Sequence, residues 1–357
     1  PTTCGQACHF QSLSGTEPKE NMTYTIYNLA EDCGVSVATI SRVINGSDKV
    51  SEKTKQKVLS TMKAHDYTPN FFARGMNKMS TGIVAVFISD ISNPFFAGIV
   101  KGLESAIQKR DIRIILCTTN NDMKQERREM ELMLQKKVDG FIIAGSRPVK
   151  DTNTDFIRRT SKGCPVVLIN GFIPSSSDEK IYSIRVDEKA ASEQALEKIL
   201  PRYKSLYLFG DESWKTTIEK KEAAISVTKK LGVRFDDSNI FRTKHDLSSG
   251  RNSARNFLMS KNISLPCLIF CVSDQIAIGV TKELTEAKIK IPEEMGILGF
   301  SDLDLCALVT PTISSVSQHI KKLGEQAAEL FIKVMDGIYI NEKNFFSEYT
   351  LVERETT

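Results

Sequence analysis

The sequence predicts a small all-α head followed by two doubly wound α/β lobes built on parallel sheets. Three observations lead to this fold class. Residues 25–45 have the pattern of two short helices joined by a tight turn, apolar runs alternate with helical segments from Ile83 onward, and the β-α-β series begins again near Ile181. Repeated β-α-β units with nearly continuous apolar strands indicate parallel sheets covered on both faces. A chain of 357 residues is also too long for one ordinary core.

Residues 25–45 fit a helix-turn-helix. Ala30 is a small contact residue, Gly34 can take positive φ at the turn, and Ile40 can anchor the second helix. Ser36 is expected to cap that helix, predicted over 37–44. Its outward face carries Val37, Ala38, Ser41, Arg42 and Asn45. Short side chains followed by an arginine suit a major groove, although an ordinary helical hairpin would show the same pattern.

A third helix is predicted over 52–65, with Val58, Leu59 and Met62 facing the core of the head. Pro69 then stops helical continuation. The next segment, 71–78, is too short to be a stable helix alone, so it reads as a linker helix that forms when something packs against it. We expect a disordered tail over 1–21, the head over 22–68, the linker over 69–80 and the two lobes over 81–357.

Composition points to a DNA-facing head in a reducing compartment. Residues 22–82 carry eight Lys and Arg against five Asp and Glu, which places three of the four net positive charges of the chain there. A phosphate-facing module needs such an excess, although a solvated helix face also has one. The eight cysteines are scattered without metal-ligand spacing, residues 1–21 lack a signal-peptide pattern, and no apolar run is long enough to span a membrane. We therefore expect a cytoplasmic protein.

The whole chain resembles the lactose/galactose repressor family of bacterial transcription regulators. The motifs that carry the resemblance are IYNLAEDCGVSVATISRVING, YTPNFFARGM, VAVFISDISNPFFAGIVKGLE, KVDGFIIAG, SDQIAIGV and GILGFSDLDL. They extend from Thr23 to about Arg354. The resemblance implies lobes like those of type I periplasmic binding proteins, a homodimer, and a pseudo-palindromic DNA operator as partner.

The resemblance also implies DNA contacts. Val37, Ala38 and Arg42 match base-reading positions, where an arginine can bond bidentately to guanine. Phosphate-holding positions are matched by Thr25, Tyr27, Ser36, Asn45 and Lys55. In the linker, Asn70, Ala73 and Met76 match residues that enter the minor groove, and Met76 stands where relatives usually place a leucine wedge. Tyr27 could instead pack within the head, and Met76 could instead pack on its dimer mate.

For the cleft between the lobes, the resemblance implies effector contacts from Asp90, Asn93, Phe95, Thr118, Asn120, Asn170, Lys221, Ser273, Asp274, Ser301 and Gln318. Sugar-binding members commonly have Arg at the Lys221 position and Asp at the Ser301 position, and Lys and Ser cannot copy their bidentate bonds. Two interpretations stay open. The effector is another polar molecule, such as a sugar phosphate paired with Lys221, or there is no tight small-molecule effector and control comes from a protein corepressor or is absent. Asp274 could also be only a helix N-cap.

Two other function classes fit less well. A sugar-binding receptor would share the lobes but would have an export signal and no basic head. An enzyme would need a catalytic signature, and we find no GxSxG, HExxH, P-loop or GxGxxG motif at a suitable place. We therefore predict a DNA-binding repressor of carbohydrate-use genes that is not an enzyme, with no metal or cofactor and with a sugar or sugar phosphate as effector. A nucleoid location follows from that function.

Overall fold

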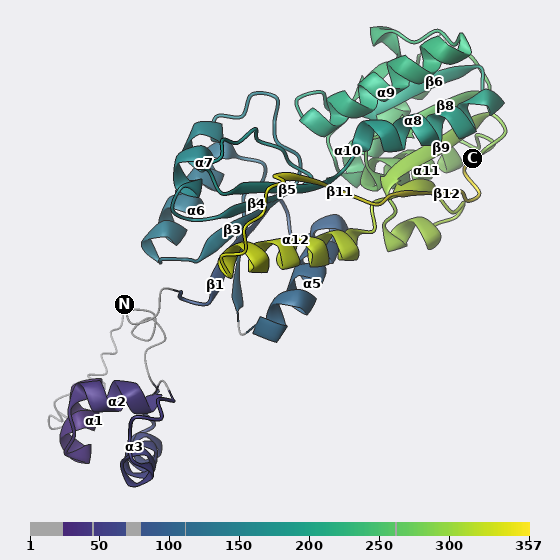
Figure 1. Ribbon diagram of the computed structural model, residues 1–357. Helices are drawn as coiled ribbons and strands as arrows, with labels where there is room; N and C mark the ends of the chain where they lie inside the picture. The colour runs from purple at the N-terminus through teal and green to yellow at the C-terminus, as the bar shows by residue number, and fades with distance from the viewer. Residues whose placement is uncertain (1–23, 45, 69–79, 111, 261–262) are drawn as a thin grey trace, which may run out of the picture. The chain divides into compact units, whose positions relative to one another are not determined.

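The computed structural model describes residues 24–44, 46–68, 80–110, 112–260 and 263–357 (Figure 1). The chain forms two compact units, Pro1–Met79 and Ser80–Thr357. The expected tail over 1–21 and residues 69–79 of the expected linker lie outside the described residues. Among the described helices, none has both the length and the apolar composition needed to cross a membrane.

The head consists of α1 (Ile26–Cys33), α2 (Val37–Ile44) and α3 (Glu52–Ala64). Thr25 and Asn28 form a capping box at the start of α1, and Gly34 ends that helix at φ 64°. Such a left-handed residue suits glycine, as the sequence predicted. The helices share a small core of Leu29, Ala30, Cys33, Ile40, Val43 and Val58. Leu59, which we expected to face inward, is 42% exposed, because it lies one position and therefore about 100° around the helix from buried Val58.

The first lobe of the second unit contains a six-stranded parallel sheet in the order β11-β5-β4-β3-β1-β2. Its strands are β1 (Ile83–Ile88), β2 (Arg113–Thr118), β3 (Gly140–Ala144), β4 (Val166–Ile169), β5 (Ile181–Val186) and β11 (Asn344–Ser347). Its helices are α5 (Pro94–Ile107), α6 (Met123–Gln135), α7 (Thr154–Ser161) and α12 (Ile320–Met335). Two apolar clusters cover the two faces of the sheet, as a buried parallel sheet requires.

The second lobe contains a six-stranded sheet in the order β12-β10-β9-β8-β6-β7, parallel except for the β10–β12 pair. Its strands are β6 (Ser205–Gly210), β7 (Ile240–Arg242), β8 (Cys267–Cys271), β9 (Met295–Ser301), β10 (Ser314–Ser317) and β12 (Thr350–Val352). Its helices are α8 (Glu188–Ile199), α9 (Lys215–Leu231), α10 (Leu247–Leu258) and α11 (Asp274–Glu286). One large apolar cluster fills this lobe.

The chain passes between the lobes more than once, so neither lobe is a continuous segment. After β10 in the second lobe it returns to the first as α12, which lies beside α5 (Figure 1). No apolar run of strand length in the sequence marks β7, β10, β11 and β12. These strands are short and partly polar, and β11 pairs with β5, which is about 160 positions earlier in the chain. Local patterns cannot identify such a partner.

Candidate functional site

The outward face of α2 presents the expected base-reading residues. Ala38 and Arg42 are exposed, whereas Val37 is partly buried against the head core. Ser36 caps the helix as expected, because its Oγ accepts a hydrogen bond from the Thr39 N–H at 3.2 Å. Ile40 and Val43, on the opposite face, are buried. The helix therefore has one exposed face on which a short side chain, Ala38, is followed by Arg42.

The described residues among the expected phosphate contacts lie near the starts of the three helices of the head. Thr25 is exposed at the N-terminus of α1, Lys55 is partly buried on α3, and Tyr27 is 73% exposed. That exposure is against the alternative in which Tyr27 packs within the head. Asn45, Asn70, Ala73 and Met76 lie outside the described residues.

A cavity of about 480 Å³ lies between the lobes of the second unit. Its lining residues follow the carboxyl ends of strands in both sheets, which is where doubly wound folds bind ligands. Nine of the eleven expected effector residues line it: Asp90, Asn93, Phe95, Asn120, Asn170, Ser273, Asp274, Ser301 and Gln318. Thr118 and Lys221 do not.

In both exceptions, the residue that lines the cavity is the immediate neighbour in sequence of the residue expected there. Thr119 lines the cavity in place of Thr118, which ends β2. Lys220 lines it in place of Lys221, whose ammonium pairs with Glu212 at 2.7 Å and Asp237 at 3.1 Å. Neighbouring residues on a helix point about 100° apart, so only one of the two lysines can face the cleft. The suggestion that Lys221 would hold a phosphate is therefore wrong.

Lys220 is itself paired with a carboxylate of the protein. Its side chain is buried, pairs with the carboxylate of Glu188 and lies 4.0 Å from the centre of the Phe300 ring. Burial lowers the pKa of Lys220 to about 7. This lysine therefore has little free positive charge to offer to an anion.

Asp274 is a buried structural acceptor and not the N-cap of α11. The N-cap is Ser273, and Asp274 is the first residue of the helix. Its carboxylate accepts hydrogen bonds from the Leu303 N–H at 2.7 Å and the Ser315 hydroxyl at 2.6 Å. Burial raises the pKa of Asp274 to about 6. The N-cap alternative is thus excluded, and much of this side chain is already occupied by its own lobe.

A chain of amides and a hydroxyl joins the two lobes at the base of the cleft. Asn170, after β4, donates to Gln318, and the Gln318 amide donates to the Ser301 hydroxyl at 3.0 Å. Ser301 ends β9 in the second lobe. Ser301, which stands where an aspartate was expected for a sugar site, therefore already accepts a hydrogen bond from Gln318.

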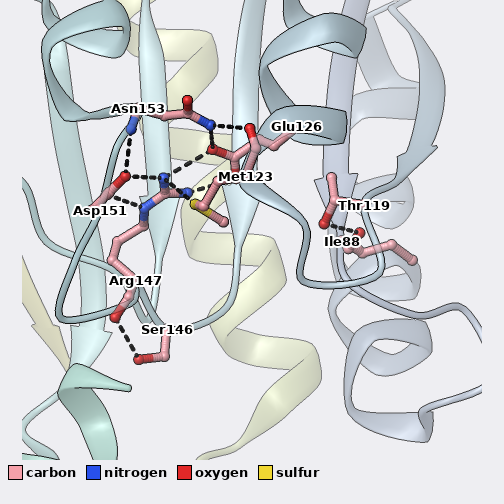
Figure 2. Close-up of polar contacts among 8 residues, drawn as sticks. All are labelled: Ile88, Thr119, Met123, Glu126, Ser146, Arg147, Asp151 and Asn153. Atoms are coloured by element: carbon pink, nitrogen blue, oxygen red, sulfur yellow. Dashed lines mark hydrogen bonds and ion pairs between the residues drawn. The ribbon is translucent and has the colours of Figure 1, made fainter. Parts of the chain in front are cut away.

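Arg147 is the centre of a buried ion network that the sequence analysis did not identify (Figure 2). Its guanidinium bonds Glu126 at 2.6 and 2.9 Å and Asp151 at 2.7 and 2.9 Å. Asn153 donates to Glu126 at 2.9 Å and to the Met123 carbonyl at 2.7 Å. The Arg147, Glu126 and Asp151 side chains are at most 4% exposed. Burial opposes the charge, but the bonds to both carboxylates raise the pKa of Arg147.

Two further polar atoms in the cavity wall are buried without a hydrogen-bond partner among the described residues. They are Nε2 of His245 and Oγ of Ser273. Burial, followed by the nearby Lys220 charge, lowers the pKa of His245 to about 4, so this imidazole is neutral near pH 7. Buried polar atoms usually have partners. The wall therefore has unused hydrogen-bonding capacity.

Charge in the cavity favours an uncharged ligand. The described lining contains six carboxylates (Asp90, Glu126, Glu188, Asp211, Asp246 and Asp274) against three cationic side chains (Arg147, Lys220 and Lys244). Two of those cations are already paired with buried carboxylates. Phe95 and Trp214 add apolar surface. No described cluster of three or more His, Cys, Asp or Glu side chains is suited to hold a metal ion.

Comparison with known proteins defines the family. Residues 25–70 match the model for bacterial regulatory proteins of the lacI family, and residues 80–350 match that for periplasmic binding proteins and the sugar-binding domain of the LacI family. Catabolite control protein A of Staphylococcus aureus is 33% identical over 94% of this chain and 100% of its own length. The chain belongs to the LacI family. It is a DNA-binding transcriptional regulator.

Solved structures show the same fold. The lac repressor dimer bound to operator and the anti-inducer ONPF matches with a TM-score of 0.79 at 20% identity, over 93% of this chain and 98% of that one. The CelR–cellobiose complex, also a transcriptional regulator, matches with a TM-score of 0.68 at 22% identity, over 93% and 99%.

Proposed function

We propose that this regulator is a cytoplasmic homodimer that represses carbohydrate-use genes and catalyses no reaction. Each α2 would read one half-site of a pseudo-palindromic operator, since a two-fold protein matches a two-fold site. Val37, Ala38 and Arg42 would contact bases. Thr25, Tyr27, Ser36, Asn45 and Lys55 would hold phosphates, and Asn70, Ala73 and Met76 would enter the minor groove.

We infer that an uncharged sugar in the cleft changes the affinity for the operator. The observation that carries this choice is the charge of the cavity, where carboxylates outnumber cations two to one and the buried cations are paired. A sugar phosphate would meet this negative excess without a free buried cation to offset it. A neutral polyol can instead bind without a compensating charge while an apolar face lies against Phe95 or Trp214.

The test is a thermal-shift screen of the purified chain against matched pairs of sugars and their phosphates, with operator binding measured for every hit. We expect a neutral sugar to raise the melting temperature by a few degrees, to change operator affinity, and to exceed its own phosphate. A phosphate that binds more tightly than its parent sugar would refute the ligand class. Tight operator binding with no hit in the screen would refute the effector and direct the search to a protein corepressor.

A further inference from the structure

Two loops, one from each lobe, meet beside the cavity and bond through their main chains. One is residues 146–149, after β3 in the first lobe, and the other is residues 213–216, before and within the start of α9 in the second. The Val149 N–H donates to the Ser213 carbonyl at 2.8 Å, and the Lys215 N–H donates to the Arg147 carbonyl at 3.1 Å. Pro148 and Trp214 form an antiparallel bridge between these bonds. We call these contacts the interlobe clasp.

The clasp supplies the N-terminal cap of α9. Helix N-termini leave N–H groups without intrahelical partners, and a side chain of the same segment usually accepts from them. Trp214 occupies the N-cap position here and its side chain makes no capping bond. The acceptors for the first N–H groups of α9 come instead from the other lobe. The Lys215 N–H donates to the Arg147 carbonyl, and the Thr216 N–H donates to the Ser146 hydroxyl at 3.2 Å. Separating the lobes would therefore leave this helix end without those acceptors.

The loop of the first lobe is held in place for this contact. The carbonyl of Arg147 faces α9, while its guanidinium is fixed by Glu126 and Asp151 in its own lobe (Figure 2). Asn153, the N-cap of α7, joins the same network, so the connection from β3 to α7 is held at both Arg147 and Asn153. A buried, fully bonded network of this kind restricts local motion. The acceptors are thus presented to α9 without any contribution from a ligand.

We propose that the interlobe clasp holds the cleft closed in the absence of effector. A ligand shifts an equilibrium only through its different affinity for the two states. A regulator that is already closed responds most to an effector that favours the open arrangement, because a ligand that favours the closed state leaves the equilibrium almost where it is. Such an effector must offset the capping bonds of α9 that opening breaks. This regulatory consequence rests on the proposed function, whereas the closure itself does not.

Lys215→Pro tests the closure by removing one main-chain hydrogen-bond donor of the clasp. Lys215 is the first residue of α9, a position that accepts proline, and Trp214 before it has φ −108° and ψ 135°, which a following proline allows. The substitution removes the N–H that donates to Arg147 and leaves the helix otherwise able to form. Lys215→Ala is the matched control, because it removes the same side chain and keeps the N–H.

Trp214 is the single tryptophan of the chain and lies in the clasp, so its fluorescence reports on closure. In the full chain without ligand, we expect acrylamide to quench Lys215→Pro at least twofold more effectively than Lys215→Ala. X-ray scattering should also give the proline variant the larger radius of gyration. Ser146→Ala, which removes the acceptor for Thr216, should shift both readouts in the same direction, with Ser146→Thr as its control.

Equal quenching and equal radii for the folded proline and alanine variants would overturn the proposal. Operator binding separates the regulatory part. We expect Lys215→Pro to change operator affinity at least threefold relative to Lys215→Ala. Equal operator affinities in a chain whose Trp214 has become exposed would refute the regulatory consequence and leave the closure standing. If the wild-type protein and both variants all fail to bind operator DNA, the proposed function is refuted.

Discussion

His245 lies in the cleft wall with an imidazole that the fold keeps neutral. Its folded pKa is about 4, below the ordinary value of 6.5, because burial and then the Lys220 charge disfavour the protonated form. Between those two values the unfolded chain takes up a proton and the folded chain does not. Stability must therefore fall as the pH drops from about 6.5 to about 4, and the slope disappears below the folded pKa.

His245→Gln should remove this pH dependence. We expect wild type to lose about 2 kcal/mol more unfolding free energy than the variant between pH 7 and pH 5, from the linkage of the two pKa values. Urea unfolding followed by Trp214 fluorescence measures both proteins. The difference between them isolates His245 from Asp274, whose raised pKa gives a slope of opposite sign over part of the range. Parallel pH profiles would show that folding does not lower the pKa of His245.

Single residues also show where sequence reasoning stops. The sequence placed most of the cleft correctly, because residues after strand ends converge in any doubly wound lobe. It could not choose between Lys220 and Lys221, since a shift of one residue rotates the side chain by about 100° and both are lysines. Arg147 looked like an ordinary charged residue, and only the fold brings Glu126 and Asp151 to it.

At the scale of elements, α5 and α12 pack closely enough to require glycine. A Cβ on Gly102 would lie 2.1 Å from the Lys321 carbonyl oxygen, and one on Gly324 would lie 2.3 Å from that of Ile99. These atoms belong to helix backbones, which cannot move as a side chain can. The amphipathic spacing of Leu323, Ala327 and Leu330 was a readable signal for α12, but its partner α5 lies more than 200 positions earlier.

Gly102→Ala should therefore destabilise the first lobe in spite of the better helix propensity of alanine. We expect a net loss of about 1–3 kcal/mol, as for other overpacked sites, although propensity alone would give a gain of about 1 kcal/mol. Gly98→Ala on the same helix is the matched control, because its Cβ would meet only the Ile320 side chain, at 2.8 Å. Thermal unfolding of the two variants compares them directly. A Gly102→Ala protein as stable as Gly98→Ala would mean that α12 can move away from α5 at little cost.

For the whole molecule, the head was the part most fully predicted. Its turn, caps and core follow from residues close together in sequence, such as Thr25, Gly34 and Ile40. The lobes needed pairings between distant segments, and the α9 cap comes from the other lobe. Local signals therefore predict the candidate DNA-contacting surface better than the cleft that would regulate it.

Operator binding by a dimer predicts different signatures for base and phosphate contacts. With the proposed contacts, Arg42→Ala would remove a base contact from each half-site, so a palindrome should lose about 2–6 kcal/mol at an unchanged salt slope, with relaxed specificity at one base pair per half-site. Lys55→Ala would remove the proposed phosphate contact from each half-site. It should weaken all sequences alike and lower the slope of log affinity against log salt by about two. Titrations of operator and mutated-operator duplexes at several salt concentrations measure both. If Arg42→Ala keeps its selectivity while its salt slope falls, Arg42 holds phosphate and α2 reads the groove through other side chains.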